Sequence, residues 1–376
     1  MYKVLLKTCV RRGGLMKKLN DISWNEYSNG LAKQCASLRI PQSGTFELTP
    51  LCNFHCKMCY VRLDKNQMEK QGRMLSAQEW INLGKSAIEA GTLFLLLTGG
   101  EIFSRDDFQE IYEGLSELGF VIVLFTNGYL INDDTIEYLK KMPPAKLRIT
   151  MYGASDETYE RVCGIKNGYT VVTKVIEKLV EAGIPVGIAM TIIKENSDDF
   201  EAVQAYAKSL DLQFNYTYEI EKPVRGARSE AECVRYDYGN ATELMHKNKD
   251  EIDQMFPKGN NRMIFPNATN KVADVCGAMN RCFWITWNGK MSMCTLISSI
   301  QEDILQLDFK KAWNQLCDRL SELKRPDKCN GCQYINFCNA CPGVLESETG
   351  DPEMISERIC KKAQAYYEVL MKDQDE

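Results

Sequence analysis

Short apolar runs alternate with longer amphipathic stretches along the chain from about Gly44 to Ile220. The runs are rich in β-branched and aliphatic residues, which is typical of strands that are buried in a parallel sheet. The pattern predicts six strands, at Thr45–Thr49, Leu93–Thr98, Val121–Thr126, Leu147–Met151, Val186–Ile193 and Gln213–Tyr218.

Amphipathic helices are expected between these strands. Ser76 and Glu79 have the spacing of a capping box that opens one helix, and Gly91 is placed to close it. Ser104 is expected to start a second helix, which ends near Gly119. Further helices are predicted at Asp133–Lys141, Tyr169–Ala182 and Asp198–Leu210.

Repeated strand–helix units indicate a parallel sheet, because parallel strands need a crossover connection, usually a helix. Six units are too few to close an eight-stranded barrel, so the sequence predicts an α/β fold with an open, partial (β/α)6 TIM-like barrel. Chemistry in such folds gathers at the carboxyl ends of the strands. Four motifs follow successive strands: a cysteine loop, Gly99-Gly-Glu101, Asn127-Gly128 and Tyr152-Gly-Ala154.

The alternation stops after Ile220, which suggests a change of domain. We expect an N-terminal extension at residues 1–43, the barrel at 44–220, a bridging segment at 221–275 and a cysteine-rich domain at 276–376. The bridging segment is polar and mixed, with one helix predicted around Ala241–Phe256. The last domain is too loop-like to build a large core alone, so bound metal clusters would have to stabilise it.

Composition narrows the class of protein. The chain has 376 residues and a formal charge of −5 without a basic face, which argues against nucleic-acid binding. No apolar run reaches the roughly 18 residues of a membrane span, and the stretch Met1–Lys18 is too weakly apolar for a signal peptide. We therefore expect a cytoplasmic protein, in which cysteines are metal ligands rather than disulfides. Of the 16 cysteines, five are scattered and have no assigned metal role: Cys9, Cys35, Cys163, Cys233 and Cys317.

Three cysteines in one short loop are the most informative feature. Cys52, Cys56 and Cys59 have the spacing C-x3-C-x2-C directly after the first predicted strand. A [4Fe–4S] cluster has four irons that each take a thiolate, so three cysteines leave one iron open for a small molecule. A zinc site on the same loop is the alternative, although the chain offers only two histidines, His55 and His246.

This loop, together with Gly-Gly-Glu after the second strand, resembles the radical S-adenosylmethionine (SAM) superfamily over roughly residues 44–220. The resemblance implies a [4Fe–4S] cluster on the three cysteines, SAM bound to its open iron, and reductive cleavage of SAM to a 5′-deoxyadenosyl radical. It also implies the SAM-binding residues, which by position are Tyr60, Gly99, Gly100, Glu101, Asn127, Thr150 and Arg161. The fourth-strand motif in many relatives reads Ser-x-Asp-Gly, whereas this chain has Thr150-Met-Tyr-Gly153.

The C-terminal cysteines resemble a SPASM extension, which holds two auxiliary [4Fe–4S] clusters. The resemblance assigns Cys276, Cys282, Cys294 and Cys341 to one cluster, and Cys329, Cys332, Cys338 and Cys360 to the other. The spacing from Cys338 to Cys341 and the gap from Cys282 to Gly289 are both shorter than usual, so the division between the clusters stays open. A pair of structural zinc knuckles is the alternative.

The resemblance favours a peptide-modifying enzyme that abstracts a hydrogen atom while maturing a ribosomally made peptide by crosslinking or oxidation. An anaerobic sulfatase-type maturase is a second possibility, disfavoured because Thr295 stands where those enzymes typically carry an aspartate. A peptide epimerase would need a thiol hydrogen donor, for which Cys163, Cys233 and Cys317 are candidates. A non-enzymatic electron carrier would not need the Gly-Gly-Glu motif.

The expected partners are a peptide or protein substrate and an external electron donor of the flavodoxin or ferredoxin type. About 45 residues precede the first predicted strand, which is short for a complete winged peptide-recognition domain. We therefore expect precursor recognition by a separate protein, by an open sheet edge or by the bridging segment. The substrate, the bond formed and the acid or base residue do not follow from the sequence.

Overall fold

A curved sheet of nine strands organises the computed structural model, which describes residues 24–235, 272 and 276–372. The strand order is β6-β5-β4-β3-β2-β1-β7-β8-β9. All neighbours from β6 to β7 pair in parallel, and only β8 and β9 are antiparallel additions at one edge. The parallel strands are β1 (Ser43–Glu47), β2 (Phe94–Thr98), β3 (Val121–Thr126), β4 (Lys146–Thr150), β5 (Val186–Thr191), β6 (Gln213–Thr217) and β7 (Cys282–Ile285).

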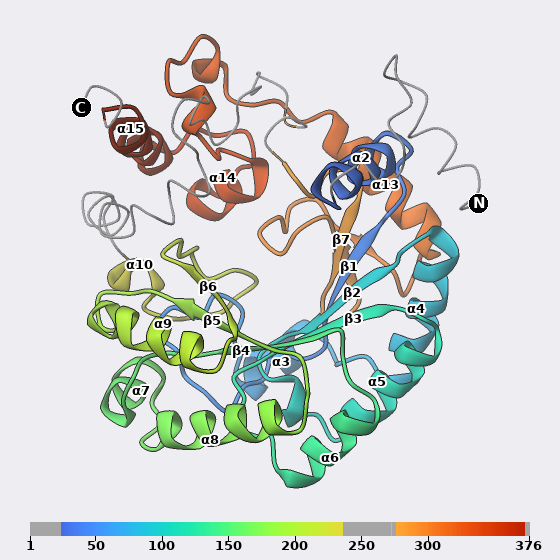
Figure 1. Cartoon of the computed structure of the whole chain (residues 1–376). Helices are drawn as coiled ribbons and strands as arrows, with labels where there is room; N and C mark the ends of the chain where they lie inside the picture. The colour runs from blue at the N-terminus through green and yellow to red at the C-terminus, as the bar shows by residue number, and fades with distance from the viewer. Residues whose placement is uncertain (1–23, 236–271, 273–275, 373–376) are drawn as a thin grey trace.

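The predicted partial barrel is confirmed, because each of the six expected strands is present within two residues of its predicted limits. The apolar alternation explains why: in β3, for example, Ile122, Leu124 and Thr126 are buried, and the residues between them are not. Figure 1 shows the strands as an arc with the helices outside it. The carboxyl ends of neighbouring parallel strands therefore meet along one rim.

Helices cover the outer face of the arc, as Figure 1 shows. The capping box predicted at Ser76 and Glu79 is present, and Gly91 closes the helix in the left-handed conformation. The outer helices are α4 (Ala77–Ala90), α5 (Phe108–Glu117), α6 (Asp133–Lys141), α8 (Gly168–Glu181) and α9 (Phe200–Ser209).

One predicted helix start was wrong. Helix α5 begins at Phe108 rather than directly after Ser104. Ser104 ends a 3-10 turn (Ile102–Ser104), where its hydroxyl donates to the Glu101 carbonyl instead of capping a helix. The next residue, Arg105, reaches inward to the carbonyls of Leu48 and Leu75, and this ties the turn to the barrel.

Several helices were not predicted. Helix α7 (Asp156–Cys163) starts at an Ser155 cap and ends at Gly164, and its C-terminal end packs against the cysteine loop. Two others are α2 (Trp24–Ser37) before the barrel and α3 (Lys65–Gln71) after the cysteine loop. The helix expected around Ala241–Phe256 lies outside the described residues.

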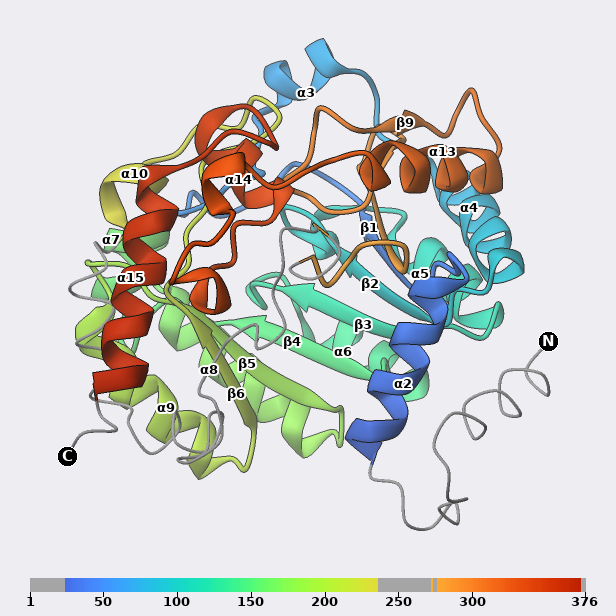
Figure 2. The same ribbon diagram turned by 90° about the horizontal axis from the view of Figure 1, so that it is seen from above.

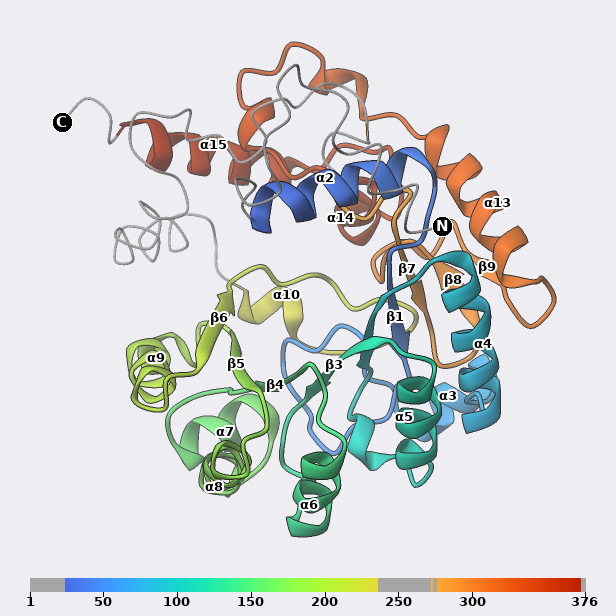
Figure 3. The same cartoon turned by 45° about the vertical axis from the view of Figure 1, so that its right-hand side comes forward.

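The C-terminal cysteine-rich part does not stand apart from the barrel. Strand β7 pairs with β1, from Ser43 opposite Cys282 to Phe46 opposite Ile285, and it continues into β8 (Lys290–Ser292) and β9 (Glu302–Asp303). Helix α13 (Phe309–Ser321) packs into the same core as the barrel. Its Trp313 donates to the carbonyl of Arg39 just after α2, and Figure 3 shows α2 and α13 on the same side of the molecule.

Two further helices complete this part, α14 (Pro342–Thr349) and α15 (Glu357–Lys372). They form small hydrophobic clusters of their own, for example Val344 and Leu345 with Ile359. Helix α15 contacts the end of the barrel where the Tyr366 hydroxyl donates to Glu219, two residues beyond β6. Figure 2 shows α14 and α15 above the strand ends of the barrel.

Candidate active site and cluster-binding sites

The cysteine loop is fixed on both sides by backbone hydrogen bonds. Beyond β2, Gly100 N–H donates to the Thr49 carbonyl at 2.7 Å and Glu101 N–H donates to the Leu51 carbonyl at 2.9 Å. On the other side, His55 N–H donates to the carbonyl of Cys163 at 3.0 Å, at the end of α7. The loop is thus held between two neighbouring elements at the carboxyl end of β1.

Gly99 and Gly100 make this close approach possible. A Cβ atom on Gly99 would lie 2.4 Å from the Thr49 carbonyl oxygen, and one on Gly100 would lie 2.1 Å from the Leu51 carbonyl oxygen. Gly99 also has φ of +147°, which disfavours other residues. In this structure the two glycines therefore bring the strand end against the cysteine loop, in addition to any contact with a ligand.

Two thiols of the loop accept backbone N–H groups. Cys52 Sγ accepts from Phe54 N at 3.3 Å, and Cys59 Sγ accepts from Arg62 N at 3.3 Å. Burial raises the pKa of Cys59 to about 11, and the nearby Cys56 thiol adds to the rise. Burial also raises the pKa of Cys52, with Cys56 and Cys59 contributing. A bound iron would reverse this preference, because a coordinating thiol is deprotonated.

Glu101 is completely buried and organises the rim between β2 and β3. Its carboxylate accepts from the Thr126 hydroxyl at 2.7 Å, from Asn127 N at 2.8 Å and from Phe103 N at 3.1 Å. Burial raises the pKa of Glu101, while these donors oppose the rise. Glu101, which the sequence predicts to bind SAM, therefore also fixes the backbone of Asn127.

Asn127 reaches the cluster loop directly. Its Nδ2 donates to Asn53 Oδ1 at 2.8 Å and lies 3.7 Å from Cys52 Sγ. Its Oδ1 accepts from Tyr129 N at 3.0 Å. Cys52, Glu101 and Asn127, which are far apart in the sequence, are thus brought together as predicted from their strand ends.

The remaining SAM-binding candidates have other surroundings. Thr150 is the last residue of β4 and is half-buried. Arg161 is exposed on α7, where Nη2 donates to the Glu195 carbonyl at 2.9 Å and to Thr158 Oγ1 at 3.1 Å. The Tyr60 carbonyl accepts from Val224 N at 2.9 Å, and burial raises the pKa of its hydroxyl, with Glu47 as the next cause.

The C-terminal thiols fall into two groups according to which thiols affect one another's pKa. In the first group, burial raises the pKa of Cys294 and of Cys341, and each is raised further by neighbouring thiols that include Cys276. Burial raises the pKa of Cys282 as well, and Cys276 again contributes. This group lies next to β7 and β8, at the edge of the barrel.

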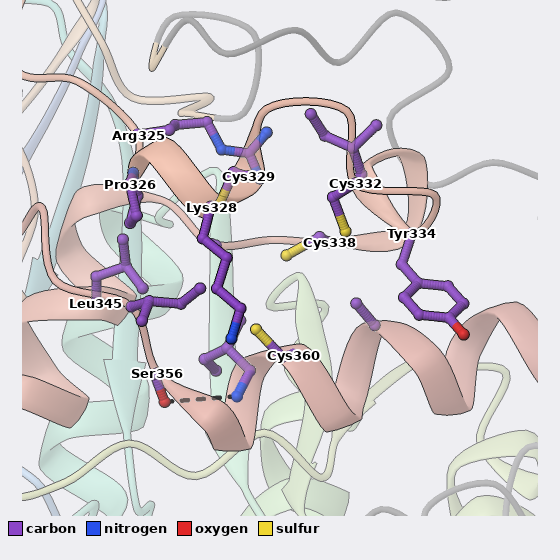
Figure 4. A pocket seen from close by; sticks show the side chains of 15 residues that line it. Arg325, Pro326, Lys328, Cys329, Cys332, Tyr334, Cys338, Leu345, Ser356 and Cys360 are labelled. Carbon is purple, nitrogen blue, oxygen red and sulfur yellow. Dashed lines mark hydrogen bonds between the residues drawn. The ribbon is translucent and has the colours of Figure 1, made fainter.

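The second group surrounds a cavity of about 190 Å³. Figure 4 shows its four sulfur atoms around one space, between the segment that follows α13 and the start of α15. Burial raises the pKa of Cys360, and the thiols of Cys338 and Cys332 add to the rise. The lining thiols are Cys329, Cys332, Cys338 and Cys360.

The donor sets fit iron–sulfur clusters. All fifteen cysteines that the structure describes are free thiols. Within the described ranges, no three His, Cys, Asp or Glu side chains come together closely enough to hold a single metal ion. Thiolates are the ligands that iron–sulfur clusters take, and the structure places four of them around one cavity.

Residues 46–207 match the family model of the radical SAM superfamily. The barrel is a radical SAM domain. Such a domain carries a [4Fe–4S] cluster and binds SAM, which agrees with the three-thiol loop and its neighbouring strand ends. Among described residues, no helix has the length and apolar character needed to cross a membrane.

Some known proteins are similar to this chain over the radical SAM domain alone, and others are similar over most of its length. The sporulation killing factor maturation protein SkfB of Bacillus subtilis (strain 168) is 33% identical over 164 residues, which cover 44% of this chain and 39% of SkfB. An AdoMet-dependent heme synthase of Methanosarcina barkeri (strain Fusaro / DSM 804) is 24% identical over 338 residues, 84% of this chain and 95% of that protein.

Solved structures show the same fold for nearly the whole chain. Streptococcus suis SuiB bound to S-adenosylmethionine has a TM-score of 0.66 and 19% identity, and the match covers 91% of this chain and 84% of SuiB. SuiB has also been solved bound to its precursor peptide SuiA. The chain therefore has the fold of SuiB over nearly its whole length, and the predicted α/β radical SAM fold is confirmed.

Sequence reasoning missed Asn53 and Glu47 around these sites, and it named Cys163 only as a candidate hydrogen donor. Cys163, at the end of α7, is fully buried next to Cys56, and the contact between their thiols is the largest cause of the raised pKa of Cys56. Asn53 accepts from Asn127. Glu47 is a buried carboxylate at the end of β1. A carboxylate inside a predicted strand was the one signal in the sequence that pointed to Glu47.

Proposed function

We propose that this protein is a radical SAM/SPASM enzyme that matures a ribosomally made peptide by hydrogen-atom abstraction, leading to a crosslink or an oxidation. The observation that carries the proposal is the three-thiol loop at the carboxyl end of β1, held against Glu101 and Asn127. The same fold in SuiB, and the name of SkfB as a maturation protein, support a peptide as the substrate.

The chain's own residues would hold the reactants at the barrel rim. Cys52, Cys56 and Cys59 would ligate three irons, and the open iron would take the amino and carboxylate groups of SAM. When bound, the cluster supplies the electron that cleaves SAM to the 5′-deoxyadenosyl radical. Glu101, through Thr126 and Asn127, would fix the rim on which SAM lies. Tyr60, Gly99, Gly100, Thr150 and Arg161 remain our proposal for the rest of the SAM pocket.

The two C-terminal thiol groups would hold two auxiliary [4Fe–4S] clusters, which makes three clusters in the chain. Each group supplies four thiols, one for each iron, so both clusters would be fully ligated. A fully ligated cluster suits electron transfer, and it can remove the electron that hydrogen-atom abstraction leaves on the substrate. The four thiols around the cavity near α15 support this division.

The reaction also needs partners from outside the chain. The electron that starts each turnover would come from a flavodoxin- or ferredoxin-type donor, and a separate protein would present the precursor peptide. The sixteen cysteines, with no disulfide among those that the structure describes, fit a reducing cytoplasm.

The test is co-expression of the full chain with short peptides encoded beside its gene, under anaerobic conditions. We expect one peptide to lose mass in steps of two hydrogen atoms, and the Cys52→Ala, Cys56→Ala, Cys59→Ala triple variant to leave it unchanged. A mass change that persists in the triple variant would contradict the proposal.

A haem-synthase type of activity is the second candidate function, because the similarity to the archaeal heme synthase covers 95% of that protein. It predicts that the reconstituted protein forms haem from a tetrapyrrole precursor in a SAM-dependent reaction. Haem formation, together with no peptide modification, would favour this candidate over the first.

A further inference from the structure

A buried carboxylate at the end of β1 connects the barrel to the first C-terminal thiol group. Glu47 is 1% exposed, and its Oε2 accepts from Arg225 Nη2 at 2.6 Å and from Trp284 Nε1 at 2.9 Å. Its Oε1 has no hydrogen-bond partner among the described residues. A buried, half-satisfied carboxylate costs stability, so its retention calls for a reason.

Arg225 is held in an equally costly way. Its backbone has φ of +50°, a left-handed conformation that is unfavourable for a residue with a side chain. Its Nη1 donates to the Thr295 carbonyl at 2.7 Å and to Thr295 Oγ1 at 3.1 Å. The backbone is fixed from the other side, where Gln71 Nε2 donates to the Arg225 carbonyl at 2.9 Å.

These contacts place the ion pair between two of the proposed clusters. Trp284 comes two residues after Cys282, and Thr295 directly follows Cys294, so both partners belong to the first C-terminal group. On the barrel side, the carbonyl of Tyr60, the residue after Cys59, accepts from Val224 N at 2.9 Å, so the residue before Arg225 is fixed beside the cysteine loop.

A buried ion pair is not needed simply to attach the C-terminal part to the barrel. Well-packed apolar residues often stabilise a protein as much as a buried ion pair, or more. A charged pair, unlike apolar residues, changes the electrostatic potential at nearby redox groups. The reduction potential of an iron–sulfur cluster depends on the charges and hydrogen bonds around it. In a site with little water, such an effect is only weakly screened.

We propose that the Glu47–Arg225 pair sets the reduction potential of the cluster on Cys276, Cys282, Cys294 and Cys341, relative to the other auxiliary cluster. The inference rests on the proposed three-cluster function. Reduction adds one electron to a cluster, so a nearby negative charge lowers the potential and a nearby positive charge raises it. Glu47 and Arg225 are positioning residues for electron uptake and do not themselves react.

The test is a redox titration followed by electron paramagnetic resonance, on the anaerobically reconstituted full chain with Cys52, Cys56 and Cys59 replaced by alanine. This background leaves only the two auxiliary clusters visible. Glu47→Gln should raise the potential of one cluster, and Arg225→Met should lower the potential of the same cluster. The second cluster, around Cys360, is the internal control and should not shift.

Matched variants separate charge from structure. Glu47→Asp and Arg225→Lys keep the charges and should leave the potential close to its starting value. Trp284→Phe removes a neutral donor to the same oxygen and should shift the potential less than Glu47→Gln. The Glu47→Gln, Arg225→Met double variant removes both charges and should return the potential toward the starting value, even if one single variant does not fold.

Four results would overturn the inference. Shifts of equal sign in the two single variants, or no shift in either single variant and the double variant, would show that the charges do not set the potential. Equal shifts of both clusters would show a general disturbance of the fold. Absence of auxiliary clusters before any change at Glu47 would overturn the three-cluster function as well, and the starting spectrum identifies this case.

Discussion

The barrel loop and the cavity near α15 hold thiols in two different ways. The loop places three thiols within eight residues at the end of one strand, and its rigidity comes from the neighbouring strand β2 and helix α7. The cavity collects four thiols from residues 329–360, around a space of about 190 Å³. Three thiols on a rigid rim suit a cluster with an open iron, whereas four thiols around a cavity suit a closed one.

The strongest test of this comparison removes the rim thiols. The Cys52→Ala, Cys56→Ala, Cys59→Ala triple variant should lose SAM cleavage completely, because no iron is left for SAM to bind, and it should keep about eight irons (two clusters of four). Iron analysis and 5′-deoxyadenosine release measure both effects. Continued 5′-deoxyadenosine formation would refute the assignment of the open site.

The reverse change removes the cavity thiols. Replacing Cys329, Cys332, Cys338 and Cys360 with serine should remove about four irons (one cluster) and lower the melting temperature of the chain. SAM cleavage in the absence of substrate should continue, since the barrel site is intact. Loss of SAM cleavage in a variant that still folds would show that the two sites do not act separately.

A single methyl group tests how the rim is built. Gly100→Ala places a Cβ atom 2.1 Å from the Leu51 carbonyl oxygen, and such overpacking typically costs about 1–3 kcal/mol of unfolding free energy. The variant should also take up iron poorly at the loop. Gly183→Ala is the matched control, because nothing lies within 4 Å of its Cβ and only backbone strain remains. Equal destabilisation by the two variants would argue against the close approach.

The smallest expected effect follows from removing the Glu101 carboxylate. Glu101→Ala should weaken SAM binding by roughly 1.5–3 kcal/mol if a charge-assisted hydrogen bond is lost. The structure adds a second effect, because the Asn127 N–H and the Thr126 hydroxyl lose their acceptor. Calorimetry gives the SAM dissociation constant, and an unchanged constant would remove Glu101 from the SAM site. Asn127→Ala is the companion variant that leaves the carboxylate in place.

Local signals predicted the barrel well. The strands follow from apolar alternation, and helix α4 follows from a cap at Ser76 and a glycine at Gly91 whose effects act within a few residues. The rim of Cys52, Glu101 and Asn127 also followed, because parallel strand ends must lie together. The SPASM-type division of the C-terminal cysteines rests on a resemblance and stays a prediction.

Long-range contacts explain what was missed. Strand β7 pairs with β1, although more than two hundred residues separate them in the sequence. The four-residue apolar run of β7 contains no signal that identifies β1 as its neighbour. The partners of Glu47 are Arg225 and Trp284, 178 and 237 residues away, so no local pattern reveals them. Helix α7 was missed because it is short and half of its residues are charged, although Ser155 and Gly164 mark its ends.

The most direct test of the account measures iron and sulfide per chain after anaerobic reconstitution, together with 5′-deoxyadenosine release under reductant on the same sample. The account predicts about twelve irons (three clusters of four) and SAM cleavage. About four irons with cleavage would contradict the two auxiliary clusters, and well-folded protein with neither iron nor cleavage would contradict the radical chemistry itself.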